Sequence, residues 1–192
     1  LVRSRGLGDV YKRQAFTALL DGAPVAATEF TDHSGTRFQR LQVGTGSLVI
    51  DYRAHIDGEG AEAPGVPYDL FSSRLPSRYV ESDVLSPTAA AEFAGIDPGA
   101  DLLAAVSSWV GTQLSYVPGA SGPTDGAVET LLRRQGVCRD YAHLCAALLR
   151  ARGVAARVAA VYAPGLAPME FHAVTEAWID DAWRVVDATA LA

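Results

Sequence analysis

The stretch GVCRDYAHLCAALLRARG, residues 136–153, carries the strongest helix signal in the chain. Its apolar and aromatic residues recur at intervals of three and four, which places them on one face of a helix: Tyr141, Ala142, Cys145, Leu148 and Leu149. Gly153 follows the periodic run, and glycine is common just beyond a helix end. We therefore predict a helix over Cys138–Arg152 with one buried face.

Cys138 is the first residue of this predicted helix. The backbone N–H groups of a first helical turn lack partners and favour an anion. This position therefore favours the thiolate, which is the nucleophilic form of cysteine. Cys145 falls on the apolar face well inside the helix, and we interpret it as a small buried hydrophobic residue. A lone cysteine does not establish chemistry, so a structural role for Cys138 stays open here.

A predicted hairpin supplies the base that a nucleophile requires. Residues 171–179 alternate between apolar and polar, Asp180-Asp181 form a two-residue turn, and residues 183–188 return. In that register Asp187 is a diagonal neighbour of His172 on the same sheet face, within reach of its side chain. An imidazole beside a carboxylate suits proton transfer. A purely structural hydrogen bond is the alternative.

The rest of the chain predicts an α+β fold. Ser-Pro and Asp-Pro pairs are typical of helix starts. We predict helices from Ser86-Pro87 to about Ala94, from Asp97-Pro98 to about Gly111, and over 126–135. A strand is predicted over 154–162, before the hairpin. The helix that begins at Cys138 is then expected to pack on a mainly antiparallel sheet.

The first 60 residues differ in character from the rest. Residues 1–14 are basic, whereas the whole chain has a net charge of −6, and we expect a non-native leader there, with a basic interaction tail as the alternative. Strand signals follow, including Leu48–Ile56 and a turn at Asp32–Gly35. The expected organisation is a leader (1–14), a β-rich region built of hairpins (15–60), a linker (61–73) and a catalytic core (74–192).

Three blocks together resemble the catalytic blocks of bacterial transglutaminase-like proteins, which belong to the papain-like cysteine superfamily. They are GVCRDYAHL at 136–144, MEFHA at 169–173 and WRVVDAT at 183–189. The resemblance runs from Arg74 to the end of the chain. It implies a papain-like transglutaminase core with Cys138 as nucleophile, His172 as base and Asp187 as the orienting acid. It also implies that residues 15–60 belong to a β-rich N-terminal region and that the core is truncated at its C-terminus.

The other polar candidates carry weaker signals. The Tyr116 hydroxyl is a candidate oxyanion donor beside the Cys138 backbone N–H, with core packing as the alternative. His143 does not share the face of Cys138, so we interpret it as a packing or surface residue. We expect Asp140 to bond nearby backbone or an arginine. A zinc site from Cys138, His143, Cys145 and His172 has poor ligand geometry, so no metal and no cofactor are expected.

The composition excludes several classes of binding partner. The chain has 192 residues and no basic stripe for a phosphate backbone, so we expect no nucleic-acid partner. It has no apolar run long enough to span a membrane and no visible signal peptide, so we expect a cytoplasmic protein without a membrane partner. The expected substrate is a peptide or protein amide, attacked through a Cys thioester that water or an amine resolves. The alternative is a non-catalytic binding or scaffold module on the same fold.

Overall fold

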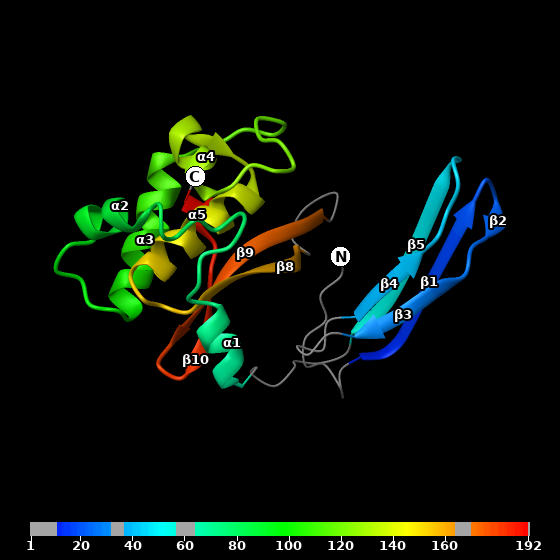
Figure 1. Cartoon of the computed structure of the whole chain (residues 1–192), viewed down its shortest axis with the longest axis horizontal. Coiled ribbons are helices and arrows are strands. Elements are labelled where there is room, and N and C mark those ends of the chain that lie inside the picture. Colours follow the sequence, from blue (N-terminus) through cyan, green and yellow to red (C-terminus); the bar gives the residue numbers. More distant parts are fainter. Residues whose placement is uncertain (1–10, 32–36, 57–63, 164–169, 192) are drawn as a thin grey trace. The chain divides into compact units, whose positions relative to one another are not determined.

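The computed structural model describes residues 11–31, 37–56, 64–163 and 170–191, drawn in colour in Figure 1. The chain divides into two compact units, Leu1–Ala63 and Pro64–Ala192. The turn predicted at Asp32–Gly35 and Met169 of the second sequence block lie outside the described residues.

The described residues of the first unit form strands and the turns between them, as predicted. Strand β1 (Tyr11–Leu20) lies between β2 (Ala23–Pro24) and β5 (Leu48–Ile56), and β3 (Ala27–Thr31) pairs with β4 (Arg37–Leu41). The predicted strand bounds of β5 are confirmed. Because β1 begins at Tyr11, the last four residues of the expected leader lie in a strand that pairs with β5. Ala18 is the one buried apolar side chain among the described residues of this unit.

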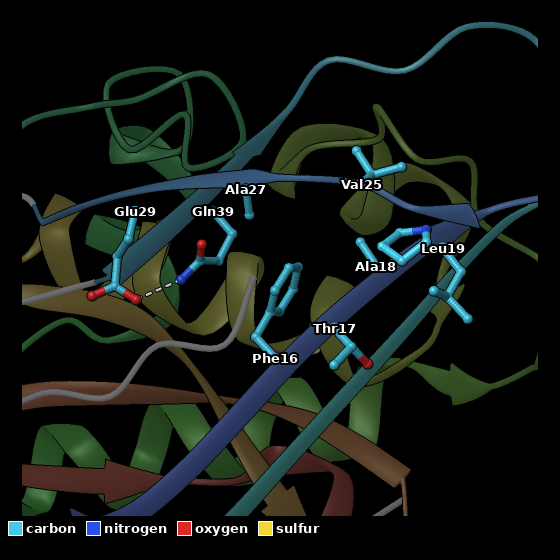
Figure 2. A pocket seen from close by; sticks show the side chains of 9 residues that line it. Phe16, Thr17, Ala18, Leu19, Val25, Ala27, Glu29 and Gln39 are labelled. Carbon is cyan, nitrogen blue, oxygen red and sulfur yellow. Dashed lines mark hydrogen bonds between the residues drawn. The ribbon is translucent and has the colours of Figure 1, made fainter. Parts of the chain in front are cut away.

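An open pocket of about 510 Å³ lies in the first unit (Figure 2). Its apolar lining comes from β1, from β2 and the connection that follows it, and from the start of β3, and its polar end holds Glu29 and Gln39. The Gln39 amide donates a hydrogen bond of 2.5 Å to the Glu29 carboxylate. None of the residues predicted to carry the chemistry lines this pocket.

The second unit begins with helices. They are α1 (Pro67–Ser72), α2 (Ser86–Glu92), α3 (Ala100–Gln113), α4 (Ala127–Arg133) and α5 (Cys138–Ala151). Helix α1 falls inside the range expected to be a linker. No helix among the described residues has the length and apolar character needed to cross a membrane.

The predicted start of α2 at Ser86-Pro87 is confirmed to within one residue, whereas the predicted start and end of α3 are wrong by a few residues. Leu85 is the N-cap of α2; it is buried, and its carbonyl accepts the Ala89 N–H at 2.9 Å. Helix α3 begins at Ala100 and not at Asp97-Pro98, and the Gly99 carbonyl accepts the N–H of Leu103 at 3.1 Å.

The predicted end of α3 at Gly111 is also wrong. The helix continues to Gln113, since burial of Val110 and Leu114 offsets the cost of about 1 kcal/mol for a glycine within a helix.

Helix α5 is the centre of the core, and its predicted start is confirmed. Residues Leu144–Leu149 are all buried, among apolar side chains from α2, α3 and α4 and from the sheet. Gly153 has a φ of +79°, its N–H bonds the Arg150 carbonyl, and the Val154 N–H bonds the Leu149 carbonyl at 3.0 Å. These bonds form a Schellman motif, so the predicted glycine cap is also confirmed.

The sheet has the order β10-β9-β8 and is antiparallel, formed by β8 (Ala156–Ala163), β9 (Glu170–Ile179) and β10 (Ala182–Val186). Trp183 pairs with Trp178, as the predicted register requires. Asp180 and Asp181 both have positive φ, as a tight two-residue hairpin turn requires. Helix α5 packs against the sheet (Figure 1), and the Thr175 hydroxyl donates to the Ala142 carbonyl at 2.9 Å.

The predicted return strand is too long at its C-terminal end. Strand β10 ends at Val186, and Ala188–Leu191 form a 3-10 helix, η1, that contacts α3 and α5. Because Ala188 is buried in the core, the chain leaves the sheet at this point. Asp187 therefore lies at the junction between β10 and η1.

Candidate active site

His172 and Asp187 form a direct hydrogen bond. The distance from His172 Nε2 to Asp187 Oδ2 is 2.7 Å, and the side chains are 16% and 33% exposed. His172 comes from β9, and Asp187 follows the neighbouring strand. The juxtaposition predicted from the hairpin register is present, although Asp187 lies just beyond the strand. Because Nε2 contacts the carboxylate, Nδ1 is the ring nitrogen left for a nucleophile.

Thr189 completes this cluster and was missed as a functional residue. Its backbone N–H and its hydroxyl both donate to Asp187 Oδ1, at 3.1 and 2.5 Å, and its hydroxyl lies 3.5 Å from His172 Nε2. The available signal was the register of the predicted hairpin: if the return strand continued past residue 188, Thr189 would lie opposite His172. That pairing assumed a continuing strand, whereas the observed contacts come from the turn into η1.

The surroundings of Asp187 favour its charged form. Burial alone would raise the pKa of the Asp187 carboxyl. The hydrogen bonds from Thr189 and from His172 outweigh burial, so the pKa lies below its ordinary value of 3.8. Asp187 is therefore a carboxylate at neutral pH, as an acceptor for an imidazole N–H must be.

Cys138 is a free, partly exposed thiol at the first position of α5, and Val137 is the N-cap residue. The Val137 carbonyl accepts the N–H groups of Asp140 and Tyr141, at 2.8 and 3.2 Å. Among the described residues, no hydrogen bond occupies the Cys138 N–H. The thiol and an available backbone donor therefore belong to the same residue.

Cys145 differs from Cys138 in its exposure to solvent. It is buried, and burial raises the pKa of its thiol well above the ordinary value, with a further increase from the nearby Asp187 carboxylate. Seven residues make almost two helical turns, so Cys138 and Cys145 lie on the same side of α5. The side of α5 that begins at Cys138 therefore borders Asp187.

A buried network holds the start of α5. The Asp140 side chain is fully buried, and its carboxylate accepts the Val137 N–H at 2.8 Å and the Ser121 hydroxyl at 2.5 Å. Arg139 adds a contact of 2.9 Å to the same carboxylate. The predicted backbone and arginine partners of Asp140 are confirmed. A Cβ on Gly136 would lie 2.6 Å from the Asp140 Cβ, so glycine permits this close approach.

Tyr116 lies beside the residues that lead into α5. Strand β6 (Ser115–Tyr116) pairs in parallel with β7 (Gln135–Gly136), and Tyr116 is opposite Gly136. Its side chain is 47% exposed, and its ring is 6.0 Å from that of Tyr141. Core packing does not account for so exposed a ring, and its role as an oxyanion donor stays a prediction.

His143 is a packing residue, as predicted. It is buried, and its ring stacks on Tyr79 with the centroids 5.5 Å apart. Burial lowers the pKa of His143 below its ordinary value of 6.5, and the charge of Arg139 lowers it further. Within the described part of the chain, no cluster of three His, Cys, Asp or Glu side chains could hold a metal ion.

A family model identifies the family, and curated relatives match part of the chain. The family model of the transglutaminase-like superfamily core matches residues 87–188. An uncharacterized protein of Mycobacterium tuberculosis is 35% identical over 101 residues, which cover 51% of this chain and 32% of the relative. An uncharacterized protein of Mycobacterium leprae is 34% identical over 58 residues, covering 30% of this chain and 21% of the relative. The chain thus spans a third or less of the length of these relatives.

Solved structures agree on the fold. A candidate cysteine protease from Cytophaga hutchinsonii is 32% identical with a TM-score of 0.81, covering 95% of this chain and 69% of that one. The periplasmic domain of TgpA from Pseudomonas aeruginosa is 21% identical with a TM-score of 0.53, covering 100% of this chain and 76% of that one. The matched region, 87–188, contains the start of α5 and the His172–Asp187 pair. The chain therefore belongs to the transglutaminase-like superfamily.

Proposed function

We propose that the chain is a cysteine enzyme that transfers or hydrolyses an acyl group at an amide or ester carbonyl. Cys138 is the nucleophile, His172 transfers protons, and Asp187 orients the imidazole. The observation that carries the proposal is the 2.7 Å bond between His172 and Asp187 in the unit whose central helix begins at a partly exposed thiol.

Two further features support a functional triad over a structural pair. The bond at His172 Nε2 fixes the tautomer in which Nδ1 carries the lone pair, which is the form that accepts a thiol proton. Asp187 lies close enough to Cys145 to affect its pKa, and Cys145 shares a helix side with Cys138. This proximity supports a triad on the side of α5 that begins at Cys138.

The chemistry follows from these positions. The Cys138 sulfur attacks the carbonyl carbon, and its proton passes to His172. The oxyanion accepts a hydrogen bond from the Cys138 N–H, with the Tyr116 hydroxyl as a second donor. The imidazolium then protonates the leaving amine as the C–N bond breaks, which leaves a thioester on Cys138. Water or an amine, deprotonated by His172, resolves the thioester.

Hydrolysis is the outcome that we favour, with a peptide or protein amide as substrate. The support is the likeness to the Cytophaga hutchinsonii protein, described as a candidate cysteine protease. Transfer to an amine proceeds through the same thioester as hydrolysis. The two reactions differ only in whether an amine or water attacks the thioester.

An ester probe tests the thioester step. p-Nitrophenyl acetate should release p-nitrophenolate and leave an acetyl group on Cys138, detected by peptide mass. Cys138→Ala should abolish both signals, whereas the matched variant Cys145→Ala should keep them. A folded wild-type protein that takes up no acetyl group would support a non-catalytic binding or scaffold module instead.

A second assay separates the acceptors. A glutamine-containing peptide is incubated with and without a primary amine, and the products are identified by mass. Peptide cleavage indicates proteolysis, conversion of glutamine to glutamate indicates deamidation, and incorporation of the amine indicates transglutamination. Incorporation of the amine as the dominant product would contradict the preference for hydrolysis.

A further inference from the structure

The start of α5 is tied to a loop that is distant in sequence. The loop Val117–Asp125 approaches the nucleophile helix through Ser121, whose hydroxyl donates to Asp140, and through Gly122, whose carbonyl accepts from Arg139 at 2.8 Å. The loop is also braced within itself, since the Gly122 N–H donates to the Asp125 carboxylate at 2.8 Å. The loop and the first turn of α5 thus form one connected unit.

We propose that Asp140 is a positioning residue for acyl transfer: its buried carboxylate fixes the backbone that leads into Cys138 and locks Ser121 against it. This inference rests on the proposed function, because it concerns how the same nucleophile meets its substrate. Asp140 does not contact the substrate; it acts through Val137, Ser121 and Arg139.

The hydrogen bonds around Val137 show how this positioning works. The Asp140 carboxylate accepts a hydrogen bond from the Val137 N–H, and the Val137 carbonyl accepts the N–H groups of Asp140 and Tyr141. Both polar groups of Val137 are therefore engaged, whereas the next N–H, that of Cys138, has no hydrogen-bond partner within the described part of the chain. The preceding Gly136 carbonyl accepts the Val117 N–H at 2.9 Å, which anchors the strand that carries Tyr116. Both expected oxyanion donors therefore depend on the segment that Asp140 holds.

Stability alone gives a weak reason for a charged group at this place. The Asp140 side chain is fully buried, and a buried ion pair often contributes no more stability than apolar residues of similar volume. A carboxylate that accepts hydrogen bonds from Val137, Ser121 and Arg139 does supply one defined geometry. Definite geometry matters most where reacting atoms must be aligned, since a displacement of 1 Å can reduce a rate about 100-fold.

Two reactions of the same thiol separate positioning from nucleophilicity. Alkylation by iodoacetamide requires the thiolate but no oxyanion donor, whereas acylation by p-nitrophenyl acetate requires both. Asp140→Asn keeps the side-chain shape and removes a negative charge near Cys138. Slower acylation with unchanged alkylation in this variant therefore reports a misplaced oxyanion donor and not a less reactive thiol.

The experiment measures both rates at Cys138 in four proteins: wild type, Asp140→Asn, Ser121→Ala and Glu81→Gln. Glu81 is the matched control, because its carboxylate accepts the Ala127 N–H at 2.8 Å at the start of a different helix, α4. Thermal unfolding and circular dichroism establish that each variant is folded under the assay conditions.

We expect acylation by Asp140→Asn to fall about 10- to 100-fold while alkylation stays within about 3-fold of wild type. Ser121→Ala, which removes one donor to the carboxylate, should show the same split with a smaller loss, and it carries the test if Asp140→Asn does not fold. Glu81→Gln should leave both rates unchanged. Unchanged acylation in the Asp140 and Ser121 variants, or an equal loss of both rates, would overturn the inference. A wild type that alkylates but does not acylate would overturn the proposed function itself.

Discussion

Thr189 donates two hydrogen bonds to one carboxylate oxygen of Asp187, from its backbone N–H at 3.1 Å and from its hydroxyl at 2.5 Å. The other oxygen of Asp187 is left for His172, at 2.7 Å. The two oxygens thus have separate partners, and the plane of the carboxylate is fixed on both sides. An orienting acid that cannot rotate holds the imidazole in one tautomer and one direction.

The Thr189 hydroxyl can be removed with little change of shape. We expect Thr189→Val to lower the acylation rate about 10-fold, because Asp187 loses one of its two fixing hydrogen bonds on Oδ1. Since the Thr189 hydroxyl is one of the groups that lower the pKa of Asp187, its loss raises that pKa, and the acid limb of the pH–rate profile moves to higher pH. Thr189→Ser, which keeps the hydroxyl, should restore both values. Equal activity of the Val and Ser variants would contradict this role.

Cys138 should react much faster than Cys145 with iodoacetamide in the folded protein. Cys138 is partly exposed at a helix start, whereas burial and the nearby Asp187 raise the pKa of the Cys145 thiol. We expect a difference of at least about 10-fold at neutral pH, measured by the mass of the two cysteine peptides. Unfolding in denaturant should abolish the difference. Equal rates in the folded protein would contradict the assignment of Cys138 as the nucleophile.

His172 and Asp187 should control the rate of that alkylation. In the proposed mechanism His172 accepts the thiol proton, so His172→Ala should slow alkylation of Cys138 at neutral pH. Asp187→Asn should slow it less, because the imidazole remains but loses its carboxylate acceptor. Rates are measured at one pH, with Cys145→Ala as the background. Equal rates in wild type and both variants would show that the pair does not act on Cys138.

The local signals predicted most of the second unit because each depends on near neighbours in sequence. Helical periodicity predicts the start of α5, and the backbone conformation open to glycine predicts the cap at Gly153. The length of the turn predicts the register between β9 and β10. The contact of Asp187 with His172 could be derived from that register alone. These features need no knowledge of distant parts of the chain.

The features that sequence reasoning missed depend on contacts between distant segments. The chain turns into η1 after Asp187 because Ala188 is buried against other elements. No local sequence pattern predicts this turn. The bond from Ser121 to Asp140 joins residues 19 apart through a loop without periodicity. Thr189 was present in the third sequence block, but its hydrogen bonds depend on the turn.

His143 should make the stability of the folded protein decrease in mild acid. Burial, and then the charge of Arg139, lower the pKa of His143 below 6.5, and the facing carboxylates of Asp140 and Glu81 oppose this only in part. The unfolded chain therefore binds a proton at a higher pH than the folded chain does. The stabilising contribution of neutral His143 is complete above pH 6.5 and is lost progressively as the pH falls from there to the lowered pKa of the folded state.

His143→Phe tests this sign directly. Phenylalanine keeps a ring to stack on Tyr79 and cannot be protonated. We expect the free energy of unfolding to fall less between about pH 7.5 and pH 5 in the variant than in wild type, as measured by urea unfolding at each pH. Because the comparison uses the difference between two pH values, any constant cost of the substitution cancels. If the free energy of unfolding instead falls more steeply with decreasing pH in His143→Phe than in wild type, folding raises the pKa of His143. That result would contradict the prediction.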